Sequence, residues 1–159
     1  MLMKAEKLDL ETMMNGWLEG DAHIYPFMIQ YEDTDAAGIV YHANYINFAE
    51  RARTALLRCM GVDMNDLIHR GEIIVISRIG IEYKNPSVIG DRLFVRTNDF
   101  RLGRSTLNMR QVIGAVDGSI RAALDVRGAF VSASGGKPIR VPEDVRARMA
   151  KFTSLNLVK

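Results

Sequence analysis

The feature that most restricts the fold of this chain is a single long apolar helix followed by a series of strand-like runs. Between Tyr45 and Met60, apolar residues recur at the three-and-four spacing of an α-helix, with Asn44 as the N-cap and Gly61 as the C-terminal stop. A sheet with one apolar face has this helix to bury that face against. The sequence therefore predicts an α+β domain in which an antiparallel sheet wraps around one long central helix.

The runs after the helix have the composition of long antiparallel strands. In the first run, Ile79, Ile81 and Tyr83 alternate with polar residues and glycine, as in a strand with one buried face. The pair Asp117-Gly118 is a strong hairpin signal between the last two runs. The predicted strands cover residues 72–84, 92–102, 105–116 and 119–133.

The two ends of the chain complete the predicted organisation. A strand begins at His23 and tolerates Pro26 because the proline lies near its start. Proline and acids followed by bases predict a short helix at residues 141–152. At 159 residues the chain has the length of about one domain, assigned to residues 23–159. Residues 1–22 are interpreted as an added amphipathic arm, with apolar residues on a loose helical repeat: Leu8, Met13, Met14, Trp17 and Leu18.

Composition excludes several classes of function. The 21 Lys and Arg are scattered and nearly balanced by 19 Asp and Glu, so the net charge of +2 does not indicate nucleic-acid binding. The one cysteine, Cys59, lies in the helical pattern, which leaves no internal disulfide or cysteine-rich zinc site and fits a reducing cytoplasm best. The first twenty residues are too charged for a signal peptide, and no run is long enough to span a bilayer.

One short stretch, YEDTDAAGIVYHANYINFAERAR at residues 31–53, concentrates the residues suited to chemistry. If a loop runs from Asp35 through Gly38 into a helix that starts near His42, the free N–H groups of the first helical turn point into the space enclosed by the loop. Such groups hold a developing oxyanion, and a nearby carboxylate supplies a base or nucleophile. The competing interpretation is an ordinary Asp-Thr-Asp turn at the surface.

Taken as a whole, this stretch resembles the signature of the hotdog-fold acyl-CoA thioesterases of the 4-hydroxybenzoyl-CoA thioesterase family, most of all their bacterial branch associated with the Tol-Pal envelope system. The shared pattern is Asp-x-Asp, a glycine, Val-Tyr-His, Asn-Tyr and an aromatic-rich helix ending in Glu-x-Ala-Arg. The segments IEYKNP, GD, GRSTLNMRQVI and KPIRVP follow in the family's order, so the resemblance covers His23 to Pro142. The arm has no counterpart in the family, and Ala36-Ala37 replaces the commoner Ala-Gly.

The resemblance implies a role for each residue of the stretch. Asp35 would be the catalytic carboxylate, acting as a nucleophile or as a general base on water. The backbone N–H of Tyr41 would polarise the thioester carbonyl, while the side chains of Tyr41 and His42 would shape or orient the site. For His42, capping or packing is an equal alternative. Asp33 would hold the loop. The residues expected to line the acyl pocket are Gly38, Ile39 and Val40.

Other polar residues have two interpretations. A related branch places its catalytic acid on the central helix, but Glu50 is flanked by Arg51 and Arg53, which favours a helical ion pair. His23 and His69 are interpreted as structural residues in a strand and a polar turn, and no two histidines have metal-ligand spacing, so no metal is expected. The phosphates of coenzyme A need cations to bind them, but arginines on strands are more often solvated than bound to a ligand. The candidates are Arg78, Lys84, Arg92 and Arg104, with Ser77 and Ser105 as hydroxyl donors, and Ser77, Arg78 and Arg104 are preferred.

The resemblance therefore predicts an acyl-CoA thioesterase that hydrolyses a short-chain aliphatic or aromatic acyl-CoA to a free acid and coenzyme A, without a cofactor. The family implies a homodimer or homotetramer with coenzyme A at the interface between subunits. The first alternative is a non-catalytic acyl-CoA-binding or scaffolding hotdog protein of an envelope-associated complex. A hotdog hydratase or dehydratase is a second alternative, but its longer motif is not found in the sequence.

Overall fold

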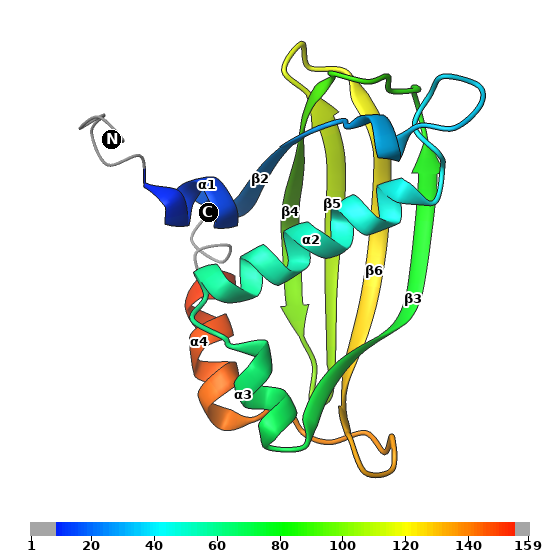
Figure 1. Ribbon diagram of the computed structural model, residues 1–159. Coiled ribbons are helices and arrows are strands. Elements are labelled where there is room, and N and C mark those ends of the chain that lie inside the picture. The colour runs from blue at the N-terminus through cyan, green and yellow to red at the C-terminus, as the bar shows by residue number, and fades with distance from the viewer. Residues whose placement is uncertain (1–8, 155–159) are drawn as a thin grey trace, which may run out of the picture.

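The computed structural model describes residues 9–154, which form a six-stranded antiparallel sheet with a long helix across it (Figure 1). The strand order is β1-β2-β4-β5-β6-β3. The strands are β1 (Trp17–Glu19), β2 (Ala22–Met28), β3 (Glu72–Tyr83), β4 (Arg92–Leu102), β5 (Thr106–Ala115) and β6 (Ile120–Ser132). The helices are α1 (Leu10–Asn15), α2 (Asn44–Cys59), α3 (Met64–His69) and α4 (Glu143–Ser154), and a 3₁₀ turn covers Tyr31–Asp33.

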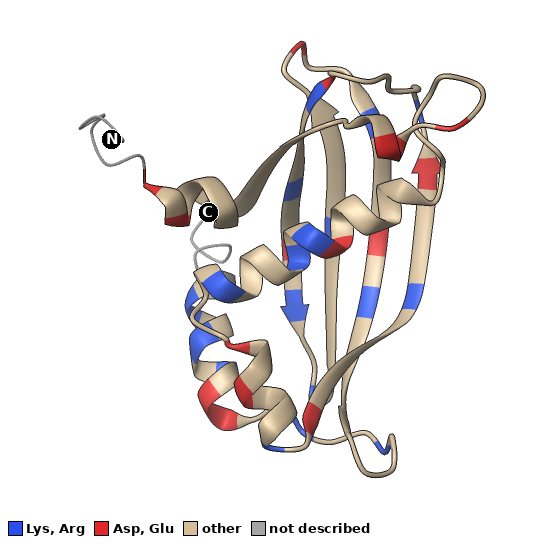
Figure 2. Cartoon of the chain, viewed as in Figure 1, with Lys and Arg blue, Asp and Glu red and all other residues tan. Residues whose placement is uncertain are grey.

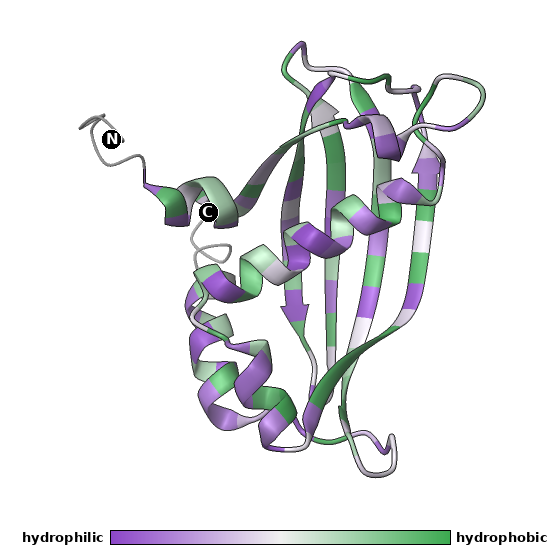
Figure 3. Ribbon diagram, viewed as in Figure 1, coloured by the Kyte–Doolittle hydropathy of each residue, from purple (hydrophilic) through white to green (hydrophobic). Residues whose placement is uncertain are grey.

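The α+β prediction is confirmed, and β3 to β6 end within one residue of their predicted bounds. The agreement follows from the period of two in side-chain direction along a strand. In β4, for example, Leu93, Val95 and Thr97 are buried, whereas the residues between them are more exposed. Figure 3 shows hydrophilic and hydrophobic residues alternating along these strands.

The face of α2 that contacts the sheet is apolar and rich in small residues. Ala49, Ala52 and Ala55 are fully buried, and Phe48 and Leu56 are almost fully buried. Small side chains let a helix approach its neighbour closely, while each large apolar side chain contributes about 1.5–3 kcal/mol on burial. The same core contains sheet residues such as Val95, Ile113 and Leu124. The sheet curves around this one central helix, as the sequence predicts (Figure 1).

A buried polar network crosses this core. Arg53 of α2 is 6% exposed, and its Nη1 donates to Oε1 of Gln111 on β5 at 2.7 Å. Gln111 Nε2 in turn donates to the Ala49 carbonyl and to Thr97 Oγ1, both at 3.1 Å. These bonds fix the position of α2 against the middle of the sheet, because a buried polar group that loses its partner costs about 1–3 kcal/mol.

Two short helices close one end of the sheet (Figure 1). The predicted terminal helix is confirmed as α4, but α3 was not predicted, and His69 lies in its last turn instead of in a polar turn. The N-cap of α3 is Asp63, whose Oδ1 accepts the N–H of Asn65 at 2.8 Å. Within residues 9–154, no helix is both long and apolar enough to cross a membrane.

The N-terminal arm joins the sheet. Its β1 pairs with β2, and α1 lies against α2, while Leu8 lies outside the described residues. The carbonyl of Asn15 accepts a hydrogen bond from His23 Nε2 at 2.6 Å, and Asn15 Oδ1 accepts one from Arg58 Nε at 2.6 Å. At Gly16, with φ +70°, a Cβ would lie 1.9 Å from the Ile24 carbonyl oxygen, so only glycine fits this contact. The apolar residues of the arm, Met13, Met14, Trp17 and Leu18, are exposed.

The strand β3 forms one edge of the sheet. Within the described part of the chain it has a strand neighbour on one side only, β6. None of its twelve residues is buried, although the run Ile73 to Ile76 is apolar. An exposed edge of this length with apolar side chains is a surface suited to a further strand.

Candidate active site

The loop that follows β2 is built around Asp35. The Asp35 N–H donates to the Ile39 carbonyl at 3.0 Å, and the Gly38 N–H donates to the Asp35 carbonyl at 2.9 Å. Asp35 Oδ1 accepts the N–H of Ala37 at 2.8 Å, while Gly38 has a φ of +76° that favours glycine. The loop therefore holds one oxygen of an exposed carboxylate and leaves the other free to act on a ligand.

Asp33 anchors this loop from below, which agrees with the structural role expected of it. Its side chain is 6% exposed, and its Oδ2 accepts the N–H of Gln30 at 2.7 Å. Its carbonyl oxygen accepts the N–H of Tyr41 at 3.0 Å and Nδ2 of Asn44 at 2.9 Å. The two ends of the loop are thus tied together next to the start of α2.

The start of α2 differs from the prediction in two respects. The N-cap position is Ala43 instead of Asn44, which is the first helical residue and uses its side chain on Asp33. The Tyr41 N–H, expected to face a thioester carbonyl, donates to Asp33 in this structure. Within residues 9–154, the N–H groups of His42 and Ala43 have no backbone acceptor. Donors at a helix N-terminus attract anions, so these two N–H groups are available to an anionic or carbonyl oxygen of a ligand.

Aromatic rings support the helix start. The rings of Tyr41 and His42 lie 4.6 Å apart, and both residues are exposed. Tyr83, at the end of β3, donates its hydroxyl to the His42 carbonyl at 2.9 Å, and its ring packs edge-on against that of Tyr45 at 5.7 Å. Partial burial, together with the nearby Tyr45 and Tyr41, raises the pKa of the Tyr83 hydroxyl above its usual value, so it stays a neutral donor at neutral pH.

Tyr83 and Ser87 also belong to this site, although the sequence does not indicate it. Ser87 is almost fully buried; its carbonyl accepts the N–H of Val40 at 2.9 Å, and its Oγ accepts the Tyr45 hydroxyl at 3.2 Å. The one signal for Tyr83 is the segment IEYKNP, which belongs to the family resemblance, and Ser87 directly follows that segment. Their partners lie about forty residues away in sequence, and no local pattern indicates such pairs.

The predicted acyl-pocket residues lie in two environments. Gly38 and Ile39 are exposed on the loop, so either can contact a ligand there. Val40 is 3% exposed and belongs to the hydrophobic core beneath the loop. Its side chain therefore supports the loop from inside.

The predicted coenzyme A contacts lie away from Asp35 within one protomer. Ser77 and Arg78 precede Tyr83 on β3, and five residues of strand span ~17 Å. The Ser77 hydroxyl donates to the Arg127 carbonyl at 3.2 Å. Arg104 lies in the turn between β4 and β5, at the end of the sheet opposite the Asp35 loop (Figure 1). Within the single chain, these residues do not lie together with the loop.

The prediction of an ion-paired Glu50 is confirmed. Arg53 Nε donates to Glu50 Oε2 at 3.0 Å, and Arg53 Nη2 contacts the same oxygen. The Glu50 carboxylate is therefore paired with a buried arginine. Among the described residues, no group of three His, Cys, Asp or Glu side chains is placed to hold a metal ion. An exposed carboxylate on the loop that leads into the start of α2 is therefore the arrangement that best fits acid–base or nucleophilic chemistry at a carbonyl.

Comparisons of sequence and of structure both find thioesterases. Residues 29–149 match the family described as the thioesterase-like superfamily. The acyl-CoA thioesterase YbgC of Haemophilus influenzae is 32% identical over 124 residues, which cover 77% of this chain and 90% of that protein. A probable thioesterase from Bartonella henselae is similar in structure, with a TM-score of 0.70 and 30% identity over 76% of this chain and 99% of that one. The DHNA-CoA thioesterase of Staphylococcus aureus, with a TM-score of 0.79 and 22% identity over 85% of this chain and 93% of that one, shares the fold.

Proposed function

This chain belongs to the thioesterase-like superfamily and has its hotdog fold, and we propose that it hydrolyses a short-chain aliphatic or aromatic acyl-CoA to a free acid and coenzyme A. Acyl-CoA thioesterase is the activity named for its YbgC relatives. The observation that carries the proposal is the placement of the exposed Asp35 loop against the start of α2, where two backbone N–H groups are open.

Asp35 supplies the reacting carboxylate. Either it attacks the thioester carbon directly, forming an anhydride that water then cleaves, or it removes a proton from the water that attacks. Both routes break the carbon–sulfur bond and release coenzyme A as the thiol. The hydrogen bond from Ala37 to Oδ1 holds the carboxylate in one orientation, so Oδ2 is the reacting oxygen.

The helix start supplies the electrophilic part of the site. The N–H groups of His42 and Ala43 donate to the oxyanion that forms on the thioester oxygen, and one such donor is typically worth ~3–4 kcal/mol of barrier. The Tyr41 N–H joins them only when its bond to the Asp33 carbonyl opens. The exposed imidazole of His42 gives a proton to the leaving sulfur, or donates a hydrogen bond that orients the attacking water, and the ring of Tyr41 shapes its position.

Substrate contacts come from the loop and from arginines elsewhere on the sheet. Gly38 and Ile39 contact the acyl group, and the buried Val40 supports the loop beneath them. Ser77, Arg78 and Arg104 bind the phosphates of coenzyme A. Arg104 is supported by its surroundings, because it lines a hollow of about 440 Å³ together with Arg140 and Arg146.

A second copy of the chain completes the site. Two β3 edges that pair antiparallel, about a two-fold axis, set the β4–β5 turn of one copy beside the Asp35 loop of the other. This arrangement brings Arg104 of a second copy toward Asp35, which one protomer cannot do. The proposed assembly is a cytoplasmic homodimer or homotetramer, in the Tol-Pal-associated branch that the motif resembles. The alternative is a non-catalytic acyl-CoA-binding scaffold of an envelope-associated complex.

The decisive experiment is thiol release from a panel of acyl-CoAs, from short to long aliphatic and including benzoyl types, by wild type and Asp35→Asn. The amide oxygen keeps the bond to the Ala37 N–H and removes only the charge. Asp117→Asn is the matched control, since Asp117 Oδ1 accepts the Ser119 N–H at 2.9 Å in a similar turn, between β5 and β6.

We expect turnover by wild type and by Asp117→Asn, and a loss of ~10²-fold or more in kcat for Asp35→Asn. Equal rates for all three proteins would remove Asp35 from the reaction. Binding of acyl-CoA without hydrolysis by wild type would instead favour the scaffold.

A further inference from the structure

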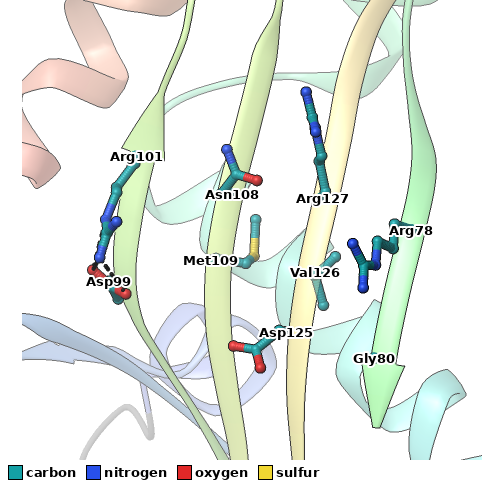
Figure 4. A pocket seen from close by; sticks show the side chains of 9 residues that line it. All are labelled: Arg78, Gly80, Asp99, Arg101, Asn108, Met109, Asp125, Val126 and Arg127. Carbon is teal, nitrogen blue, oxygen red and sulfur yellow. Dashed lines mark hydrogen bonds and ion pairs between the residues drawn. The ribbon is translucent and has the colours of Figure 1, made fainter.

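We propose that the face of the sheet opposite α2, called here the outer face, carries a binding site for a phosphate-bearing ligand. The site is an open hollow of about 530 Å³, lined by nine residues that include Arg78, Arg101, Asn108 and Arg127 (Figure 4). Hollows of this size are typical of small-molecule sites. We refer to these four residues as the outer-face row.

The outer-face row crosses four neighbouring strands. Arg101 of β4 is in register with Asn108 of β5, Asn108 with Arg127 of β6, and Arg127 with Arg78 of β3. Neighbouring strands lie about 4.8 Å apart, so the row extends over ~14 Å. Figure 2 shows basic residues at matching heights in the middle of β3 and β6. This juxtaposition depends on strand register and is invisible in the sequence.

Arg78 on β3 and Arg127 on the neighbouring strand β6 are paired in register, which is unfavourable for two like charges. Among residues 9–154, neither guanidinium has a hydrogen bond or ion pair with a protein group. On the same face, Arg110 is different, because its Nη1 donates to both oxygens of Asp125 at 2.9 and 3.0 Å. The Arg78–Arg127 pair therefore keeps its full set of donors available. The two side chains point in different directions from their strands (Figure 4), so a ligand that extends over this part of the face can contact both guanidinium groups and offset their repulsion.

Arg101 is held in place by a strained residue. Asp99 has a φ of +52°, the one positive φ outside glycine in the described chain, and it lies in the bulge between Asn98 and Arg101. Both Asp99 oxygens accept Arg101 Nη2, at 2.7 and 2.8 Å, as the dashed lines in Figure 4 show. Bulges and strained residues often serve to direct a side chain at a functional site. Here the bulge fixes the far end of the outer-face row.

The chemistry of the hollow selects a compact phosphate group. Guanidinium groups bind phosphate oxygens in pairs, and Asn108 adds an amide donor between the arginines. Gly80 also lines the hollow, and a Cβ at this position would meet no atom within 4 Å. A side chain there would therefore extend into open space, which the glycine leaves to a ligand. Asp99 and Asp125 interrupt the positive surface, so the hollow suits one or two phosphate groups better than a long polyanion.

Two sources would supply such a group. One is the nucleotide end of coenzyme A, in which case the inference rests on the proposed function and Arg78 is one member of a larger site. The other is a separate phosphate-bearing small molecule. The two share the same contacts and are separated by experiment.

The first test measures the Kd of pyrophosphate by titration calorimetry on the full chain. We expect Arg127→Gln to weaken binding about 10-fold or more, which corresponds to about 1.4 kcal/mol. Gly80→Val should weaken it similarly by filling the hollow, in a strand position that accepts a branched side chain. Arg51→Gln removes the same charge from an exposed position on α2 and should bind as wild type does. No saturable binding by wild type, or wild-type binding by both test variants, would overturn the site.

The second test compares acyl-CoA with the corresponding acyl-pantetheine, which has no phosphate. A KM for acyl-CoA that rises in Arg127→Gln, with an unchanged KM for acyl-pantetheine, identifies the nucleotide end of coenzyme A as the ligand. Unchanged KM values for both, with pyrophosphate binding lost, identify a separate phosphate-bearing ligand. Pyrophosphate binding does not require turnover, so failure of the proposed thioesterase activity would be seen independently.

Discussion

The Asp33 carbonyl accepts the Tyr41 N–H at 3.0 Å, so one hydrogen bond joins the residues on either side of the Asp35 loop. The buried residue Asp33 therefore fixes the conformation of the loop, while the exposed residues of the loop remain available to a substrate.

Replacing Gly38 by alanine should destabilise the loop by about 1–2 kcal/mol, because Gly38 has a φ of +76°. A Cβ at this position meets no atom within 4 Å, so the cost is conformational and not steric. Gly80→Ala is the control, since a Cβ there is equally unobstructed but the φ is ordinary for a strand. Urea denaturation of both variants checks the difference, and equal stabilities would contradict it.

Replacing Tyr83 by phenylalanine should remove the bond to the His42 carbonyl and lower both stability and kcat. We expect a loss of about 0.5–1.5 kcal/mol in the free energy of unfolding, the usual value for one hydrogen bond. Tyr31→Phe is the control, because Tyr31 is 84% exposed. If the kcat of Tyr83→Phe matched that of Tyr31→Phe, Tyr83 would have no part in positioning the helix start.

Replacing Gln111 by leucine should cost about 3 kcal/mol of unfolding free energy, because it leaves a buried Arg53 nitrogen without its acceptor. Adding Arg53→Met removes the unsatisfied charge and should recover part of the loss. The double-mutant cycle is measured by chemical denaturation. Strictly additive losses would show that the two side chains act independently.

The stability of the protein should fall as the pH drops below about 6.5, and His23 should contribute to that fall. Burial lowers the pKa of His23 in the folded state, against a smaller opposing effect of the Asn15 carbonyl. The unfolded chain therefore takes up a proton that the folded chain does not, at a limit of about 1.4 kcal/mol per pH unit.

Denaturation between pH 7.5 and 5.5 tests this contribution. His23→Gln should reduce the pH dependence, whereas His69→Gln, which changes an exposed residue, is the control. An unchanged slope in His23→Gln would assign the effect to other groups.

The long elements were predictable because their patterns are local and repeated. The three-and-four spacing from Tyr45 and the alternation around Ile79 and Ile81 each extend over many residues, and their bounds agree with the structure. The helix α3 has six residues, too few for a periodic pattern to stand out, although its cap at Asp63 was a readable signal.

The contacts of the site were less predictable because they join distant segments. The motif identified the Asp35 loop, but not that Asp33 accepts the Tyr41 N–H or that Tyr83 supports the helix start from another strand. The outer-face row is a further case, since Arg78 and Arg127 are separated by 49 positions and meet only through the β3–β6 register. Sequence spacing reveals neither kind of contact.

The exposed edge of β3 also has a consequence for newly synthesised chains. Its apolar run Ile73 to Ile76 offers unpaired backbone groups to any extended segment nearby, which is the usual starting point of aggregation. The proposed pairing of two β3 edges must then outpace non-specific strand addition, which becomes faster as the protein concentration rises. Charged residues farther along the strand, such as Arg78 and Glu82, limit that hazard by making flat, unregistered stacking unfavourable.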